Sequence, residues 1–428
     1  MKKLRKFLYL LTLQERKRAS LLLIMITIMA LLDMIGVASI LPFMAVLTNP
    51  GLIETNLILN NLFEASSFFG VESIQHFLFF LGVIVFITLV ISLAFKALTT
   101  YAQIRFVQMR EFSIGKRLVE GYLHQPYSWF LNRNSADLGK TILSEVSHVI
   151  GLGINPLMEL IAKGMVATAL ITLLVFTDPK LALIVGFSIG GTYGLIFFFT
   201  RSYLNQIGNI RLKNNNLRFK AVSEAFGATK EIKLGALEKI YIKRYSDSAV
   251  TYAQNQASAS VISLLPRFIL EAIAFGGILL VILYLIAKTG TFNNALPILS
   301  LYVYAGYRLM PALQQIYASS SQLTFVGASI DKLYNDIRSL KSNRSIDKED
   351  TLDLNEKITL KNIYYNYPNT SRVALKNLNL SVIANTTVGL VGSTGSGKTT
   401  TVDIILGLLI AQKGTLEVDG KKISKQKI

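Results

Sequence analysis

An eight-residue stretch near the C-terminal end of the chain carries the clearest chemical signal. The stretch fits the pattern G-x-x-x-x-G-K-[ST] at every fixed position and runs Gly392, Ser393, Thr394, Gly395, Ser396, Gly397, Lys398 and Thr399. Its glycines let backbone N–H groups turn toward phosphate oxygens, where a Cβ atom would block the approach. Lys398 is placed to reach the β- and γ-phosphates of a nucleotide, and Thr399 to bind Mg²⁺ through its hydroxyl. The pattern predicts a nucleotide phosphate site.

The residues on either side fit the strand, loop and helix order that such a site requires. Residues 387–391 form a short apolar run of β-formers, and residues 400–409 carry apolar side chains at helical spacing. A helix that begins here points the positive end of its dipole at the bound anion. We therefore expect a strand before the glycine-rich loop and a helix after it.

The composition indicates a membrane protein with a smaller soluble part. Of 428 residues, 51% are hydrophobic and only 16% are charged, which is too apolar for a soluble globular chain. The net charge of +18 falls between apolar runs, as in cytoplasmic loops that face lipid headgroups, so we expect no nucleic-acid partner. The chain has no cysteine and three scattered histidines, which excludes disulfides and argues against a metal site other than Mg²⁺.

Six apolar runs are long enough to cross about 30 Å of hydrocarbon at 1.5 Å per residue. They are 19–47, 74–95, 154–176, 181–200, 268–287 and 295–317. Residues 48–73 contain no Lys or Arg, whereas the long connections 96–150 and 201–267 are basic. The charge asymmetry places both termini and the long connections in the cytoplasm. These connections keep an apolar helical period, so we expect the helices to continue below the membrane, with separate cytoplasmic helices as the alternative.

The two ends of the apolar region have their own patterns. Residues 1–18 are typical of a basic amphipathic helix that lies on the inner leaflet, with a signal peptide's charged region as the alternative. Residues 338–351 form a polar linker, and residues 358–367 and 375–382 alternate as strands do.

Six spans with long inner helical connections, a polar linker and a strand-rich segment before a phosphate loop resemble a half-transporter of the ABC exporter class. The resemblance implies a membrane all-α six-helix transmembrane domain at 19–337 with long cytoplasmic helical extensions, followed by an incomplete α/β P-loop ATPase domain at 352–428. It also implies ATP and Mg²⁺ as cofactors, an ATPase coupled to transport, and a second half-transporter subunit, as in a homodimer, in the bacterial inner membrane.

The same resemblance assigns roles to further residues. Tyr367 would stack on the adenine, with a strand aromatic that faces the domain core as the alternative, and Thr400 would lie against the α-phosphate. Tyr365 is assigned to the core. The segments 125–130 and 223–233 resemble the two coupling helices that contact an ATPase domain, through Trp129 and Phe130 in the first and Glu224 and Phe226 in the second. An exposed Trp-Phe pair needs a partner surface.

The sequence departs from the family pattern at two places. Residues 384–385 are Ala-Asn where the family usually has a glycine, and the chain stops at residue 428 without a Walker B carboxylate, catalytic glutamate, signature sequence or switch histidine. We therefore expect a truncated product that is inactive alone. A catalytically dead partner subunit and a membrane-bound P-loop kinase or GTPase remain as alternatives.

Three ionisable residues inside predicted spans point toward a substrate. Asp33, Lys163 and Arg308 each lie roughly 20 Å from the outer end of a span at 1.5 Å per residue, and such residues face a cavity or one another. Asp33 could pair with Arg308, while an unpaired Lys163 or Arg308 would suit an anionic headgroup. The pattern resembles bacterial flippases of lipid-linked oligosaccharides, which predicts an anionic lipid-linked substrate. Peptide, drug and lipid A-type exporters are the alternatives.

Overall fold

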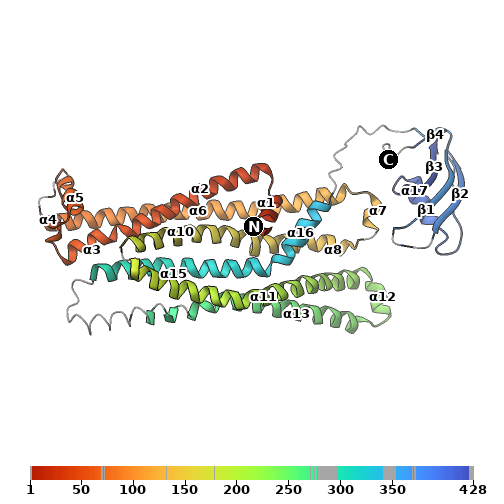
Figure 1. Ribbon diagram of the computed structural model, residues 1–428. Coiled ribbons are helices and arrows are strands. Elements are labelled where there is room, and N and C mark those ends of the chain that lie inside the picture. Colours follow the sequence, from red (N-terminus) through yellow and green to blue (C-terminus); the bar gives the residue numbers. More distant parts are fainter. Residues whose placement is uncertain are drawn as a thin grey trace. The chain divides into compact units, whose positions relative to one another are not determined.

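Long helices make up most of the chain, because a backbone inside hydrocarbon must satisfy its own hydrogen bonds. The computed structural model (Figure 1) describes the chain except residues 1, 69–70, 72, 132, 178, 270, 274, 277–278, 280–295, 341–352, 369, 371–372 and 424–428. The chain divides into two compact units. The first is Met1–Leu118 with Gly139–Arg338, and the second is Val119–Leu138 with Ser339–Ile428.

The part before the linker consists of helices and short connections, with no strand among its described residues. Its α-helices are α1 (Lys2–Leu10), α2 (Leu13–Ala38), α3 (Ile40–Thr48), α4 (Leu52–Thr55), α5 (Leu57–Ser67), α6 (Ile74–Leu123), α7 (Tyr127–Phe130), α8 (Ser135–Lys140), α9 (Val146–Val149), α10 (Asn155–Thr177), α11 (Pro179–Gly227), α12 (Thr229–Leu234), α13 (Glu238–Leu264), α15 (Leu296–Phe325) and α16 (Gly327–Ser339). Two π-helical turns, η1 (Thr141–Glu145) and η2 (Ile150–Ile154), flank α9.

Four helical stretches in the described part of the chain are long and apolar enough to cross a membrane. They are Leu13–Thr48, Ile74–Leu123, Ser135–Phe176 and Glu238–Ile273. The first three contain the predicted first, second and third spans. The predicted fourth and sixth spans fall in the helices α11 and α15, and much of the fifth falls outside the described residues.

The long connections 96–150 and 201–267 begin as helical continuations of the predicted second and fourth spans, as predicted. Helix α6 has 50 residues and α11 has 49, so each is about 75 Å long and far exceeds the roughly 30 Å hydrocarbon core. Helix α10 ends at Thr177 and α11 begins at Pro179, a position where proline is favoured because the first helical N–H has no partner within the helix. Helices α11 and α13 run side by side (Figure 1).

A buried ion pair ties four of these helical segments together. Arg211 on α11 donates to the Glu145 carboxylate of η1 at 2.8 Å, and each side chain is about 1% exposed. Asn215 donates to the same carboxylate at 2.6 Å. Arg211 also donates to Ser329 Oγ on α16 and to Tyr252 Oη on α13, each at 3.3 Å. These bonds supply the partners that charges removed from water require.

The apolar face of helix α1 packs against the rest of the helical part of the protein. Phe7, Leu10 and Leu11 are buried, and Phe7 lies so close to Gly153 that an added Cβ there would be 3.3 Å from its ring. The prediction that this face lies on the leaflet is wrong for these three residues, because the helical bundle already covers them. Leu8 and Tyr9 remain exposed.

The second unit contains a four-stranded antiparallel sheet in the order β2-β1-β3-β4. Its strands are β1 (Lys357–Asn366), β2 (Val373–Ile383), β3 (Lys413–Val418) and β4 (Lys421–Lys422), and helix α17 spans Lys398–Ile405. Leu360, Ile363 and Leu375 from the sheet form a core with Ile404 and Leu409. Both predicted alternating segments are therefore strands, as expected.

The predicted strand at 387–391 is not formed. Among the described residues, none of the four strands of the sheet pairs with this stretch. Val391 is 94% exposed. An apolar run of this kind becomes a strand only when neighbouring strands pair with it and cover it.

One carboxylate fixes the start of β1 against the turn after β3. Asp419 accepts hydrogen bonds from the backbone N–H groups of Asn355, Glu356 and Lys357 at 2.7, 2.9 and 2.8 Å. These bonds hold the pKa of Asp419 below its ordinary value, because they stabilise the ionised form.

Replacing one member of the buried pair tests its contribution to stability. Arg211→Met should lower the free energy of unfolding by about 3–5 kcal/mol, because it leaves the Glu145 carboxylate buried without its counter-charge. Denaturant or thermal unfolding of the purified protein in micelles measures this. Lys243→Met, at an exposed position on α13, is the matched control, and equal stability of the two variants would contradict the assignment.

Candidate phosphate-binding site

The glycine-rich loop adopts a backbone that only glycine tolerates easily. The φ angles of Gly392, Gly395 and Gly397 are 155°, 81° and 89°, and Gly397 immediately precedes α17. A Cβ added at Gly397 would lie 2.6 Å from Leu375 Cδ2 and 2.8 Å from the Ala374 carbonyl oxygen. Both the backbone conformation and the packing therefore require glycine at this position.

The ammonium group of Lys398 lies over this loop. It donates to the carbonyl oxygens of Gly392 at 2.7 Å and Ser393 at 2.9 Å, and to Ser396 Oγ at 3.4 Å. A phosphate oxygen is a stronger acceptor than these neutral groups because it carries charge. A bound phosphate would therefore compete with these groups for the hydrogen bonds of Lys398.

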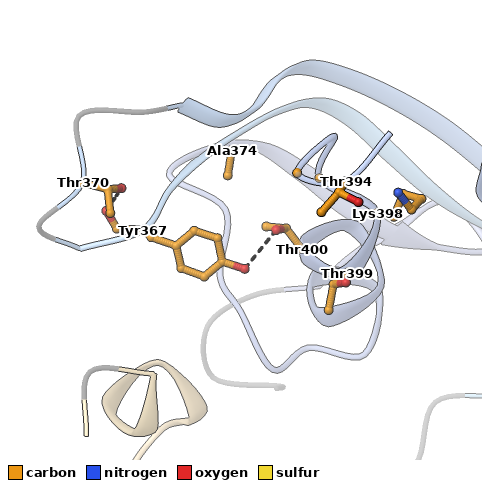
Figure 2. Close-up of a pocket in the computed structure, with 9 residues that line it drawn as sticks. Tyr367, Thr370, Ala374, Thr394, Lys398, Thr399 and Thr400 are labelled. Atoms are coloured by element: carbon orange, nitrogen blue, oxygen red, sulfur yellow. Dashed lines mark hydrogen bonds between the residues drawn. The ribbon is translucent and has the colours of Figure 1, made fainter. Parts of the chain in front are cut away.

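A pocket of about 520 Å³ opens beside the loop (Figure 2). It is lined by Tyr367, Thr370, Ala374, Thr394, Gly395, Gly397, Lys398, Thr399 and Thr400. Its wall combines an aromatic ring, three threonines near the start of α17 and the loop, and one cation. The volume is in the range of small-molecule and cofactor sites, and this chemistry suits a ligand with a flat base and a phosphate chain. The threonine hydroxyl that the motif assigns to Mg²⁺, that of Thr399, belongs to this wall.

Tyr367 joins the pocket to the helix behind the loop. Its Oη lies 2.9 Å from Thr400 Oγ1 (Figure 2), and its ring meets the edge of Tyr365 at a centroid distance of 5.2 Å. Tyr365 is buried in the core, as predicted, whereas Tyr367 is half-buried and lines the pocket. Thr400 is itself buried, so its hydroxyl contributes to the pocket through this hydrogen bond.

The residues of the first predicted coupling segment are packed. Helix α7 follows Pro126, and the Trp129 ring lies 5.5 Å from the Tyr122 ring and 5.1 Å from that of Phe130. The Arg133 guanidinium covers Trp129 at 4.1 Å. Trp129 and Phe130 are half-buried, so the expectation of an exposed pair is wrong, because the turn at Pro126 folds α7 back onto the end of α6.

The second predicted coupling segment does present an apolar surface. Phe226 is 79% exposed at the end of α11 and, with Val222 and Ile242, lines an apolar pocket of about 440 Å³ between α11, α12 and α13. Glu224 is engaged locally instead, with Arg244 at 3.2 Å and Lys220 at 3.6 Å.

The ionisable residues in the spans have different surroundings. Asp33 is buried and accepts from Ser92 Oγ at 3.1 Å and from Lys96 Nζ at 3.3 Å, both on α6. The sequence pattern missed Lys96, although a cation at the inner end of an apolar run was the available signal. Lys163 on α10 is half-buried, with no ion pair or hydrogen bond to any described residue. The side chain of Arg308 lies outside the described residues, so its pairing stays a prediction.

Known proteins match both parts of the chain. The family model for the ABC transporter transmembrane region matches residues 21–307, and a second family model, described as ABC transporter, matches residues 375–428. An ATP-dependent lipid A-core flippase of Wigglesworthia glossinidia brevipalpis is 24% identical over 328 residues, which cover 74% of this chain and 54% of that protein. One from Pseudomonas fluorescens is 21% identical over 314 residues, covering 73% and 51%.

A third relative matches a smaller part of the chain. The alpha-hemolysin translocation ATP-binding protein of Escherichia coli is 31% identical over 122 residues, which cover 28% of this chain and 17% of that protein. The chain spans about half the length of the flippases that it matches.

The loop geometry predicts a strong effect of a single methyl group. Gly397→Ala should weaken binding of a fluorescent ATP analogue at least about tenfold, since the Cβ collides with β2 and the positive φ strains alanine. Equilibrium titration of the purified protein measures the affinity. Gly389→Ala is the matched control, because an added Cβ there meets nothing within 4 Å. Equal affinities in the two variants would contradict the geometry.

Proposed function

Since the chain belongs to the ABC transporter family, we propose that it forms one half of an ATP-driven exporter of lipid-type amphiphiles. The chain is a multi-pass membrane protein by its family and its apolar helices. The proposal adds that it resides in the bacterial inner membrane with both termini in the cytoplasm. The observation that carries it is the phosphate loop of Gly397 and Lys398, which belongs to the same chain as the long membrane helices.

In the proposed ATP site, different residues of the pocket bind the phosphates, the metal ion and the base. Backbone N–H groups of the loop and the N-terminus of α17 would hold the phosphates, and Lys398 would neutralise charge at the β- and γ-positions. Thr399 would bind Mg²⁺, which neutralises further phosphate charge when bound. Tyr367 would stack on the base, while its hydrogen bond to Thr400 keeps the ring in place.

The proposed transport step needs a second subunit and a link to the membrane helices. One six-span half with one ATPase domain is half of the working unit of this class, so we propose a homodimer. Trp129 and Phe130 in α7, and Phe226 with Glu224 near α12, are the proposed coupling residues. Support for the second segment comes from the exposed ring of Phe226 beside an apolar pocket.

The proposed substrate is an anionic lipid that carries a polar headgroup. The flippases from Wigglesworthia and Pseudomonas are named for lipid A-core, which supports a lipid-type substrate. Lys163 has no described partner, and a cation left in a span suits a phosphate or pyrophosphate group. We propose a lipid-linked oligosaccharide, with a lipid A-type molecule as the second candidate because of these relatives.

The role of Lys398 predicts the result of a simple substitution. Lys398→Ala in the full-length protein should abolish ATP hydrolysis, because no other cation of the loop can replace its charge at the phosphates. Phosphate release by purified protein in liposomes measures turnover. Lys376→Ala, at an exposed position on β2, should retain activity. Equal turnover in wild type and Lys398→Ala would contradict the site.

The substrate proposal is tested by stimulation of that turnover. Lipid-linked oligosaccharide in the liposomes should raise ATP turnover of the full-length protein several-fold over phosphatidylcholine alone, and Lys163→Ala should remove most of the increase. Lys243→Ala, at an exposed position outside the six predicted spans, is the control. Stimulation by lipid A-core and not by the oligosaccharide would select the second candidate, and stimulation unchanged in Lys163→Ala would remove this residue from the substrate site.

A further inference from the structure

A basic pocket lies where α1, the first turn of α2 and α16 come together. Its volume is about 470 Å³, and it is lined by Arg5, Lys6, Leu8, Tyr9, Arg16 and Tyr334. We propose that this pocket binds the phosphate group of an anionic phospholipid of the inner leaflet. The site is separate from the proposed transport path through Lys163 and from the ATP pocket.

The pocket is a fixed part of the fold because α1 is anchored to the bundle. Phe7 and Leu10 are buried, and Arg117 donates to the Leu10 carbonyl oxygen at 2.6 Å. A capping box holds the turn into α2, where Thr12 N donates to Glu15 Oε2 at 2.8 Å and Glu15 N to Thr12 Oγ1 at 3.3 Å. The spacing between α1 and the start of α2 is therefore set before any ligand binds.

Two guanidinium groups in the pocket are available to a ligand. Arg16 Nε donates to the Leu8 carbonyl oxygen at 2.9 Å, which orients its plane and leaves its Nη groups without a partner among the described residues. Arg5 likewise has no described partner. Lys6 differs, since it is paired with Asp331 at 2.6 Å. Guanidinium groups bind phosphate oxygens in a fork-like manner, so this pair suits a phosphate.

The position along the chain places the pocket at the level of lipid headgroups. Arg16 precedes the apolar run that begins at residue 19 by three residues, which is about 5 Å along a helix. The headgroup layer on each side of the hydrocarbon is roughly 5–7 Å thick. Tyr9 and Leu8 are 41% and 42% exposed beside the cations, and exposed tyrosines of this kind are typical of membrane interfaces.

The charges select an anionic lipid over a zwitterionic one. The pocket is lined by the cations Arg5, Lys6 and Arg16 and by no carboxylate among its described lining residues, and Lys6 alone of the three is paired with a described carboxylate, that of Asp331. With the charge of Asp331 counted against these three cations, two positive charges remain in excess at the pocket. The phosphate of phosphatidylglycerol is attracted by both excess charges, whereas a zwitterionic headgroup brings a cation of its own, which these charges repel.

The experiment compares lipid binding by the purified chain in neutral detergent, measured by native mass spectrometry. Phosphatidylglycerol and phosphatidylcholine are titrated against wild type, the Arg5→Gln/Arg16→Gln variant and the Lys239→Gln/Lys243→Gln control, which loses the same charge from exposed positions on α13. We expect the pocket variant to bind phosphatidylglycerol at least about tenfold more weakly than wild type and the control to be unchanged.

A single-residue variant and a soluble competitor complete the test. Arg5→Gln alone removes an exposed side chain without a described partner, so it should fold normally and lose affinity about threefold to fivefold. Phosphatidylglycerol bound equally by wild type and either pocket variant would overturn the proposal. Displacement of the lipid by glycerol phosphate at equal concentration would assign the pocket to a soluble phosphate and overturn the lipid source. None of these readouts depends on ATP turnover, so a failure here is distinct from a failure of the proposed transport function.

Discussion

The buried ion pair between Arg211 and Glu145 is the interaction on which the helical part of the chain most depends. Apolar faces bring helices together without fixing their axial register, whereas a desolvated charge must meet its partner or cost several kcal/mol. The pair adds Asn215, Tyr252 and Ser329 to one network, so four helical segments share one register. The π-helical turn η1 contains Glu145, and η2 follows after the short helix α9; π-helical turns are frequent at functional sites.

The place of this network in the sequence gives it a role in the proposed transport step. Glu145 lies between the proposed coupling segment at 125–130 and the span at 154–176, and Arg211 lies between the span at 181–200 and the segment at 223–233. A displacement of either segment would therefore reach the spans through helices that are locked to one another. The long unbroken helices α6 and α11 suit such rigid-body movement.

What the sequence predicts well is what depends on near neighbours. The loop glycines, the start of α17, the strands β1 and β2 and the apolar helices all follow from local spacing. Contacts between distant residues do not follow from local spacing. Glu145 and Arg211 are 66 positions apart, and Asp33 and Lys96 lie on two different helices. The apolar run at 387–391 has strand-like residues, yet a strand also needs neighbours that pair with it. The prediction that Trp129 is exposed fails because composition does not reveal the turn at Pro126, which packs Trp129 against the end of α6.

In the function that we propose, nucleotide bound at the loop of Lys398 acts on the membrane helices through α7. Trp129 is the single tryptophan of the chain, so its fluorescence reports on that helix alone. A saturable change in Trp129 emission is expected when Mg·ATP is titrated into the purified 428-residue chain, and no change is expected in Lys398→Ala. Emission that is unaffected by Mg·ATP under conditions where the nucleotide binds would contradict a link through α7.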